Sequence, residues 1–110
     1  MNVSEFSEKL GGRILTGESS CEKQINGVYC CDLLSWVMSH AAKGSAWITV
    51  HNHVNIVAVA ALTELSCIII PEGIEAEEAT LKKAASEGVV IISTDLSTYE
   101  VCCIAHDCGI

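Results

Sequence analysis

The chain has 110 residues, of which half are hydrophobic, and this length is typical of one domain spanning residues 1–110. Fourteen acidic side chains outnumber six basic ones, which gives a formal net charge of −8. Nucleic-acid binding needs clustered lysines and arginines that replace counterions on phosphates, and the only arginine is Arg13. The composition therefore argues against a nucleic-acid partner, and the charge disfavours an anionic membrane surface.

The first third of the chain predicts two short strands between two helices. Residues 3–10 read as a helix that Gly11 and Gly12 stop, and residues 13–16 follow as a strand. A polar loop then leads to a second strand at residues 27–31. We expect Asp32 to cap the next helix, whose apolar residues lie within 33–41 and which Gly44 closes.

The rest of the chain alternates strands with helix-length segments. Three more strands are predicted at residues 46–50, 67–70 and 89–92. The apolar segment 54–62 has strand-like composition, but fifteen residues separate Val50 from Ser66, enough for a crossover helix between parallel strands.

A further amphipathic helix is predicted at residues 76–87, and Ser97 with Glu100 forms a capping box that starts a last helix. Alternating strands and helices predict an α/β fold, with a mostly parallel sheet and helices on both of its faces.

The seven cysteines form a poor disulfide framework, because their number is odd and four of them are adjacent pairs. The first ten residues show no basic and apolar signal segment, and the longest apolar stretch, residues 56–62, is too short to cross a bilayer. We therefore expect reduced thiols and a cytoplasmic location.

In an open α/β sheet, ligands bind outside the carboxyl ends of the strands. Two imidazoles and two carboxamides occupy the five residues 51–55, where a strand leads into a helix whose free N–H groups suit an anionic or polar ligand. Alternatively, Asn52 or Asn55 only caps the helix and the histidines are ordinary loop residues. The predicted ligand contacts are His53 and Asn55 first, followed by Thr49, His51, Asn52 and Thr94.

Metal binding and catalysis are weaker interpretations. His51 and His53 with a thiolate, or the cluster Cys102, Cys103, His106 and Cys108, have suitable donors for zinc, but no C-x-x-C pair is present. A Cys–His nucleophile has no sequence signature here, and both the phosphate-binding G-x-x-x-x-G-K-[ST] loop and G-x-G-x-x-G are missing. We expect no metal, no cofactor, and neither a self-contained kinase nor a dehydrogenase.

Several blocks together resemble the DRTGG-domain family. They are Cys31 to Met38, Ala46 to Val50, His53 to Ala60, Cys67 to Ile70 and Ser97 to Glu100. The resemblance implies a fold like the N-terminal domain of HPr kinase/phosphorylase, and a regulatory role like that of related domains in phosphate acetyltransferases and CBS-containing pyrophosphatases. The name-giving Asp-Arg-Thr-Gly-Gly pattern should follow a long strand, but residues 51–55 replace it here and its arginine is absent.

These observations predict a non-catalytic, ligand-responsive regulatory or interaction module. Its ligand is unknown, with a nucleotide or another anionic metabolite as the candidates and a protein partner as a further one. The apolar segment 56–62 predicts a homodimer, since a small domain has few ways to cover such a helix. The alternative is a thiol- or metal-dependent redox or regulatory protein that uses the Cys and His clusters.

Overall fold

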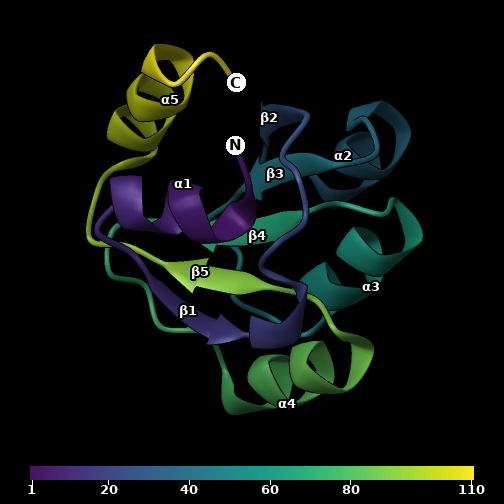
Figure 1. The fold of residues 1–110 in the computed structure, drawn as a ribbon. Helices are drawn as coiled ribbons and strands as arrows, with labels where there is room; N and C mark the ends of the chain where they lie inside the picture. Colours follow the sequence, from purple (N-terminus) through teal and green to yellow (C-terminus); the bar gives the residue numbers. More distant parts are fainter.

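In the computed structural model, which describes residues 1–110, a five-stranded sheet lies between two layers of helices (Figure 1). The strands are β1 (Arg13–Thr16), β2 (Gly27–Cys30), β3 (Ser45–Ile48), β4 (Cys67–Ile70) and β5 (Ile91–Ser93). The helices are α1 (Val3–Lys9), α2 (Leu34–His40), α3 (Asn55–Leu62), α4 (Glu78–Glu87) and α5 (Thr98–Asp107), with a short 3₁₀ turn, η1 (Glu18–Ser20). The α/β class and the order of elements agree with the prediction.

The sheet is mixed, with the strand order β1-β5-β4-β3-β2. Strands β2, β3, β4 and β5 pair in parallel, whereas β1 runs antiparallel to β5. The prediction of a mostly parallel sheet is therefore corrected. Strand β1 follows α1 directly and enters the sheet at its far edge, where no crossover helix forces it to run parallel.

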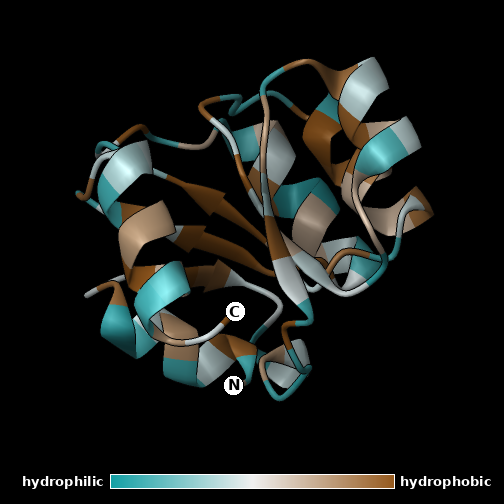
Figure 2. Cartoon of the chain, turned by 90° about the horizontal axis from the view of Figure 1, so that it is seen from above, coloured by the Kyte–Doolittle hydropathy of each residue, from teal (hydrophilic) through white to brown (hydrophobic).

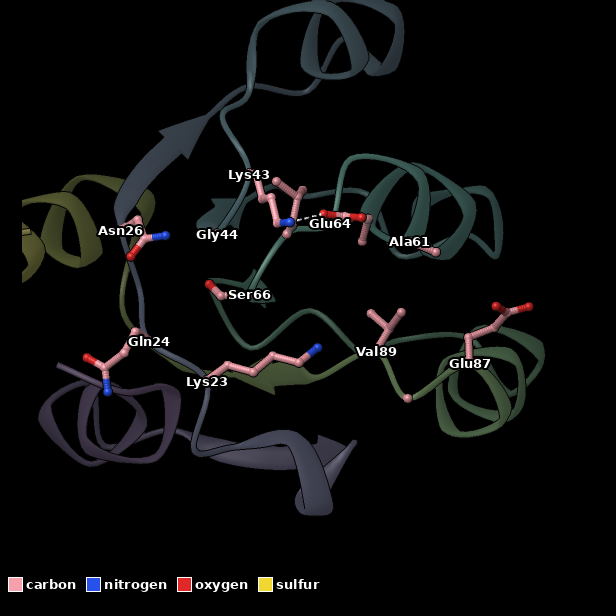
Figure 3. A pocket seen from close by; sticks show the side chains of 13 residues that line it. Lys23, Gln24, Asn26, Lys43, Gly44, Ala61, Glu64, Ser66, Glu87 and Val89 are labelled. Atoms are coloured by element: carbon pink, nitrogen blue, oxygen red, sulfur yellow. Dashed lines mark ion pairs between the residues drawn. The ribbon is translucent and has the colours of Figure 1, made fainter.

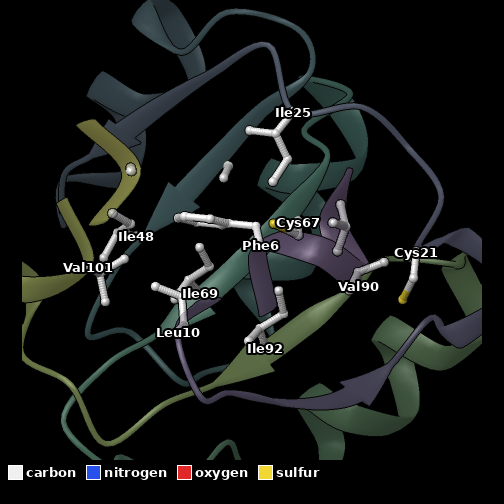
Figure 4. Close-up of a cluster of buried hydrophobic side chains, with 13 residues drawn as sticks. Phe6, Leu10, Cys21, Ile25, Ile48, Cys67, Ile69, Val90, Ile92 and Val101 are labelled. Carbon is white, nitrogen blue, oxygen red and sulfur yellow. The ribbon is translucent and has the colours of Figure 1, made fainter. Parts of the chain in front are cut away.

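The two faces of the sheet bury different residues, because successive side chains of a strand point to opposite sides. In β4, Cys67 and Ile69 face the layer of α1 and α5, while Ile68 and Ile70 face α2, α3 and α4. Phe6 of α1 lies at the centre of the first cluster (Figure 4). The hydropathy colouring shows the same arrangement, with apolar strands between the helices (Figure 2).

Burial within a single chain accounts for the apolar sequence of helix α3. Ile56, Val57, Val59 and Ala60 are all buried, in the same cluster as residues of α2 and α4. Of its apolar residues, only Ala58, Ala61 and Leu62 are exposed. The apolar sequence of this helix therefore no longer requires a second copy to cover it.

The helix boundaries confirm one predicted cap and correct another. Ser97 and Glu100 form the predicted capping box at the start of α5, and Asn2 with Glu5 forms a second one at α1. The predicted cap at Asp32 is wrong, because the N-cap position of α2 is Leu33, which makes no side-chain cap. Helix α2 ends at His40 rather than near Gly44. None of the five α-helices combines the length and the hydropathy that a transmembrane helix needs.

Candidate functional site

Four loops meet at one edge of the sheet, where the parallel strands β2 to β5 have their carboxyl ends. They begin at Cys31, Thr49, Pro71 and Thr94. The loop after β3, residues 49–54, holds most of the predicted ligand contacts and lies between the loops that follow β2 and β4. This edge is the candidate site that the sequence predicts.

Asp32 organises the loop after β3. Its carboxylate accepts a hydrogen bond from the Thr49 hydroxyl at 2.8 Å and one from the Val50 backbone N–H at 3.0 Å. The Thr49 oxygen in turn accepts from the His51 N–H at 3.2 Å, and His51 Nε2 contacts the Asp32 carbonyl oxygen. Asp32 therefore holds the loop instead of capping α2, a role that the sequence did not reveal. Thr49 and His51 are brought together, but much of their polar capacity is already used.

Asn52 serves mainly to anchor the loop. Its side-chain Nδ2 donates to the Glu75 carbonyl oxygen at 2.7 Å. Its own carbonyl oxygen accepts from the Thr80 hydroxyl at 2.7 Å and from the Glu77 N–H at 3.3 Å. The loop after β3 is thereby tied to the beginning of α4.

Thr94 lies at the same edge but is committed to the fold. It is 2% exposed, and its hydroxyl donates to the Leu10 carbonyl oxygen at 3.1 Å while accepting from the Leu96 N–H at 3.2 Å. Its side chain therefore connects β5 to the end of α1, and both its donor and one acceptor position are occupied.

His53 and Asn55 are the two predicted residues whose side chains are free. Both are exposed, and neither side chain makes a hydrogen bond within the chain. The interpretation that Asn55 or Asn52 caps the helix is wrong, because the N-cap of α3 is Val54 and no side chain caps it. The first turn is closed by its backbone, with the Ile56 N–H donating to His53 and the Val57 N–H donating to Val54. Fewer free N–H groups therefore point outward than the sequence suggested.

The electrostatics of this edge are dominated by carboxylates. Asp32, Glu72 and Asp95 follow β2, β4 and β5, and all three are exposed. Glu75 and Glu77 lie just beyond, before α4. A dense negative charge on a ligand is repelled here, so a ligand at this edge must offer His53 and Asn55 mainly hydrogen-bonding groups.

None of the six predicted site residues lines either of the two cavities. The smaller one, about 370 Å³, opens between β1 and the loop after β4, beside Arg13, Ser93 and Gly73. Arg13 Nη2 donates to the Ser93 hydroxyl there at 3.3 Å. The larger one, about 400 Å³, lies at the opposite edge of the sheet, at the amino ends of the parallel strands (Figure 3). Sequence reasoning missed both, since each is assembled from distant segments.

The thiols and imidazoles do not converge. No three His, Cys, Asp or Glu side chains lie close enough together to hold a metal ion, and all seven cysteines are free. Burial raises the pKa of the Cys67 thiol to about 12. Burial, together with the neighbouring Cys102 thiol, raises the pKa of Cys30 to about 11. Thiols with such raised pKa values stay protonated at neutral pH and are poor nucleophiles.

Comparison with known proteins identifies a similar fold and a family. No curated protein matches the chain. The fold is similar to the crystal structure of the CBS and DRTGG domains of the regulatory region of Clostridium perfringens pyrophosphatase, complexed with its activator, diadenosine tetraphosphate. That similarity has a TM-score of 0.74 at 13% identity and covers 94% of this chain but 45% of the other, so the chain spans less than half of that structure. The family model of the DRTGG domain matches residues 5–108, and the chain therefore belongs to the DRTGG domain family.

Proposed function

We propose that this chain is a non-catalytic, ligand-responsive regulatory or interaction module. The observation that carries the proposal is the DRTGG family match over residues 5–108. The similar fold in the regulatory region of a pyrophosphatase supports it, since that region is complexed with a nucleotide activator. A domain of this kind acts by a difference in affinity between two states and not by chemistry of its own.

The proposed ligand is a nucleotide or another anionic metabolite, and its proposed contacts are His53 and Asn55. Both side chains are exposed and have no hydrogen-bond partner in the chain. His51 is the next candidate, while Thr49, Asn52 and Thr94 support the loops around them. Because carboxylates surround this edge, the base and sugar of a nucleotide are better suited to these contacts than its phosphates.

The test is calorimetric titration of the full chain with diadenosine tetraphosphate, followed by adenosine mononucleotides. We expect saturable binding that His53→Ala weakens about tenfold, the effect of losing one good hydrogen bond. The matched control is His106→Ala, because His106 is also exposed but lies on α5. Absence of binding by the whole nucleotide set, or equal affinities for wild type and His53→Ala, would contradict the proposed ligand or site.

We propose three further features of this protein. They are a relationship to the N-terminal domain of HPr kinase/phosphorylase, a cytoplasmic location and a homodimer. For the homodimer, Leu62 at the end of α3 is the largest exposed apolar residue of that helix, at 72% exposure. Light scattering at micromolar concentration should give twice the mass of 11.7 kDa, and Leu62→Glu should return it to the monomer. A monomeric wild type contradicts the homodimer.

The thiol- or metal-dependent alternative receives no support from the described side chains. The candidate ligands do not form a cluster of three, and burial raises the pKa values of Cys30 and Cys67. Elemental analysis of protein prepared under reducing conditions remains the direct measurement, and stoichiometric zinc or iron would favour this alternative.

A further inference from the structure

The larger cavity lies at the amino ends of the parallel strands, whereas His53 and Asn55 lie at their carboxyl ends. Its lining includes Gly44, Ser66 and Val89, which come just before β3, β4 and β5. Further lining residues come from the segment before β2 and from the ends of α3 and α4. A volume of about 400 Å³ is in the range of pockets that hold small molecules.

One wall of the cavity includes Glu64, whose left-handed backbone conformation is rare for a residue other than glycine. Helix α3 ends in a Schellman motif, in which the Leu65 N–H donates to Ala60 and the Glu64 N–H to Ala61. Glu64 occupies the left-handed position with φ 53°, where glycine is the usual residue. With glutamate at this position, a carboxylate reaches Lys43 Nζ at 2.7 Å, beside the cavity (Figure 3).

The carboxylates around the cavity are already paired. Glu64 binds Lys43, and Glu87 binds Lys83 of the same helix at 3.0 Å. Lys23, by contrast, takes part in none of the three ion pairs of the chain. Its side chain extends toward the middle of the cavity in Figure 3. The one positive charge without a partner in this lining is therefore that of Lys23.

Two neutral donors beside Lys23 also lack good partners. Ser66 is 3% exposed, and the only contact of its hydroxyl is with the Cys67 sulfur at 3.9 Å, a weak acceptor. The Asn26 carboxamide, from the segment before β2, makes no hydrogen bond and lies over Gly44. The lining thus holds an ammonium, a hydroxyl and an amide that can all donate, while its two carboxylates are paired with lysines.

The charges around the cavity leave one positive charge unbalanced, because Lys43 and Lys83 are paired with Glu64 and Glu87 while Lys23 is not paired. Lys23, Lys43 and Lys83 are three of only six basic residues in a protein of net charge −8. The carboxyl ends of α3 and α4 oppose an anion, but they lie on the side of Glu64 and Glu87. The apolar part of the lining adjoins these two paired glutamates and consists of Ala60, Ala61, Leu65 and Val89.

We propose that this cavity binds a small organic anion with a single carboxylate or phosphate group, which Lys23, Ser66 and Asn26 hold. The remainder of the ligand then lies against the apolar side of the cavity. This site goes beyond the proposed function, since it is separate from the His53 edge and has a different source of affinity. It gives the domain a second place at which a metabolite is sensed.

The test is an NMR titration of the full chain, followed in ¹H–¹⁵N correlation spectra, with sodium acetate and with inorganic phosphate. A titration with sodium chloride at the same ionic strength is the control. We expect saturable shifts at Gly44, Ser66 and Gly88 with at least one of the two anions. Lys23→Ala should weaken that binding about tenfold, as expected for loss of a charged partner, whereas Lys23→Arg should retain most of it. Lys82→Ala is the matched control, because Lys82 pairs with Glu78 on the outer face of α4.

The two anions distinguish a carboxylate ligand from a phosphate ligand. A response to acetate alone assigns a carboxylate ligand, and a response to phosphate alone assigns a phosphate ester. Shifts that chloride reproduces, the absence of saturable shifts at these amides, or unchanged binding by Lys23→Ala would each overturn the proposal. Shifts at His53 and Asn55 with diadenosine tetraphosphate report on the proposed function instead, so that failure of one site is distinguished from failure of the other.

Discussion

Thr49 donates a hydrogen bond of 2.8 Å to Asp32 and thereby joins the ends of two neighbouring strands. Asp32 follows the edge strand β2, and Thr49 follows β3. Because Thr49 is 1% exposed, water has little access to replace Asp32 as the acceptor for its hydroxyl. The same carboxylate also receives the Val50 N–H, so one side chain fixes the conformation of the loop that leads to His53.

Asp32→Ala should lower the free energy of unfolding by about 1–3 kcal/mol, because it leaves the buried Thr49 hydroxyl without an acceptor. Asp32→Asn, which keeps one acceptor oxygen, should cost less. Urea unfolding of the three proteins measures the difference. A loss for Asp32→Ala of under about 0.5 kcal/mol, the range of ordinary surface substitutions, would show that the loop does not depend on this carboxylate.

A second buried hydroxyl supports the antiparallel edge strand. The pairing of β1 with β5 is irregular between Ile14 and Thr16. There the Thr16 hydroxyl donates to the Val89 carbonyl oxygen at 2.8 Å and accepts from the Ile91 N–H at 3.1 Å. Thr16→Val keeps the shape but removes both bonds, and should destabilise the protein by about 1–3 kcal/mol. Thr16→Ser should retain most of the stability in thermal unfolding, and a larger loss for Thr16→Ser than for Thr16→Val would assign the effect to packing instead.

Glu72 has a left-handed backbone conformation, and a substitution can relieve its strain. It has φ 61° and precedes Gly73 with φ 67° in the turn after β4. A non-glycine residue in this region costs about 1–2 kcal/mol, and asparagine tolerates it better than glutamate. Glu72→Asn should therefore raise the melting temperature, whereas Gly73→Ala should lower it. A lower melting temperature for Glu72→Asn would mean that the glutamate side chain itself stabilises the turn.

The elements of this fold were predictable because their signals are local. The crossover helix at residues 54–62 followed from the length of chain between two strands, and α3 occupies Asn55–Leu62. The capping box of Ser97 and Glu100 involves residues three positions apart, and it forms as predicted. Hydrophobic periodicity and capping depend on neighbours along the chain, which the sequence contains in full.

The relationships between distant segments were not predictable in this way. The sequence of β1 reads the same whether the strand pairs in parallel or antiparallel, and its partner β5 lies about 80 residues away. Asp32 looks like a helix cap from its neighbours, yet its hydrogen bonds reach residues 17 and 18 positions further on. The cavity beside Lys23 is built from several separate segments, so no motif announces it.

Cys67 should make stability depend on pH in the alkaline range. Burial raises the pKa of its thiol from the ordinary 9.0 to about 12 in the folded chain. Below pH 9.0 the thiol is protonated in both states, so its contribution to stability is fully present. Between 9.0 and about 12 the folded chain keeps the proton that the unfolded chain loses, and stability falls as the pH rises.

Urea unfolding at a series of pH values from neutral to alkaline should therefore show a declining free energy, and Cys67→Ala should decline less steeply. The comparison uses the slope against pH, because the variant also loses packing at every pH. In the native protein at mildly alkaline pH, a thiol reagent should leave Cys67 unmodified, since Cys67 is 1% exposed and its thiolate is scarce. Parallel slopes for the two proteins, or rapid labelling of Cys67 in the native chain, would show that β4 opens to water far more readily than its burial indicates.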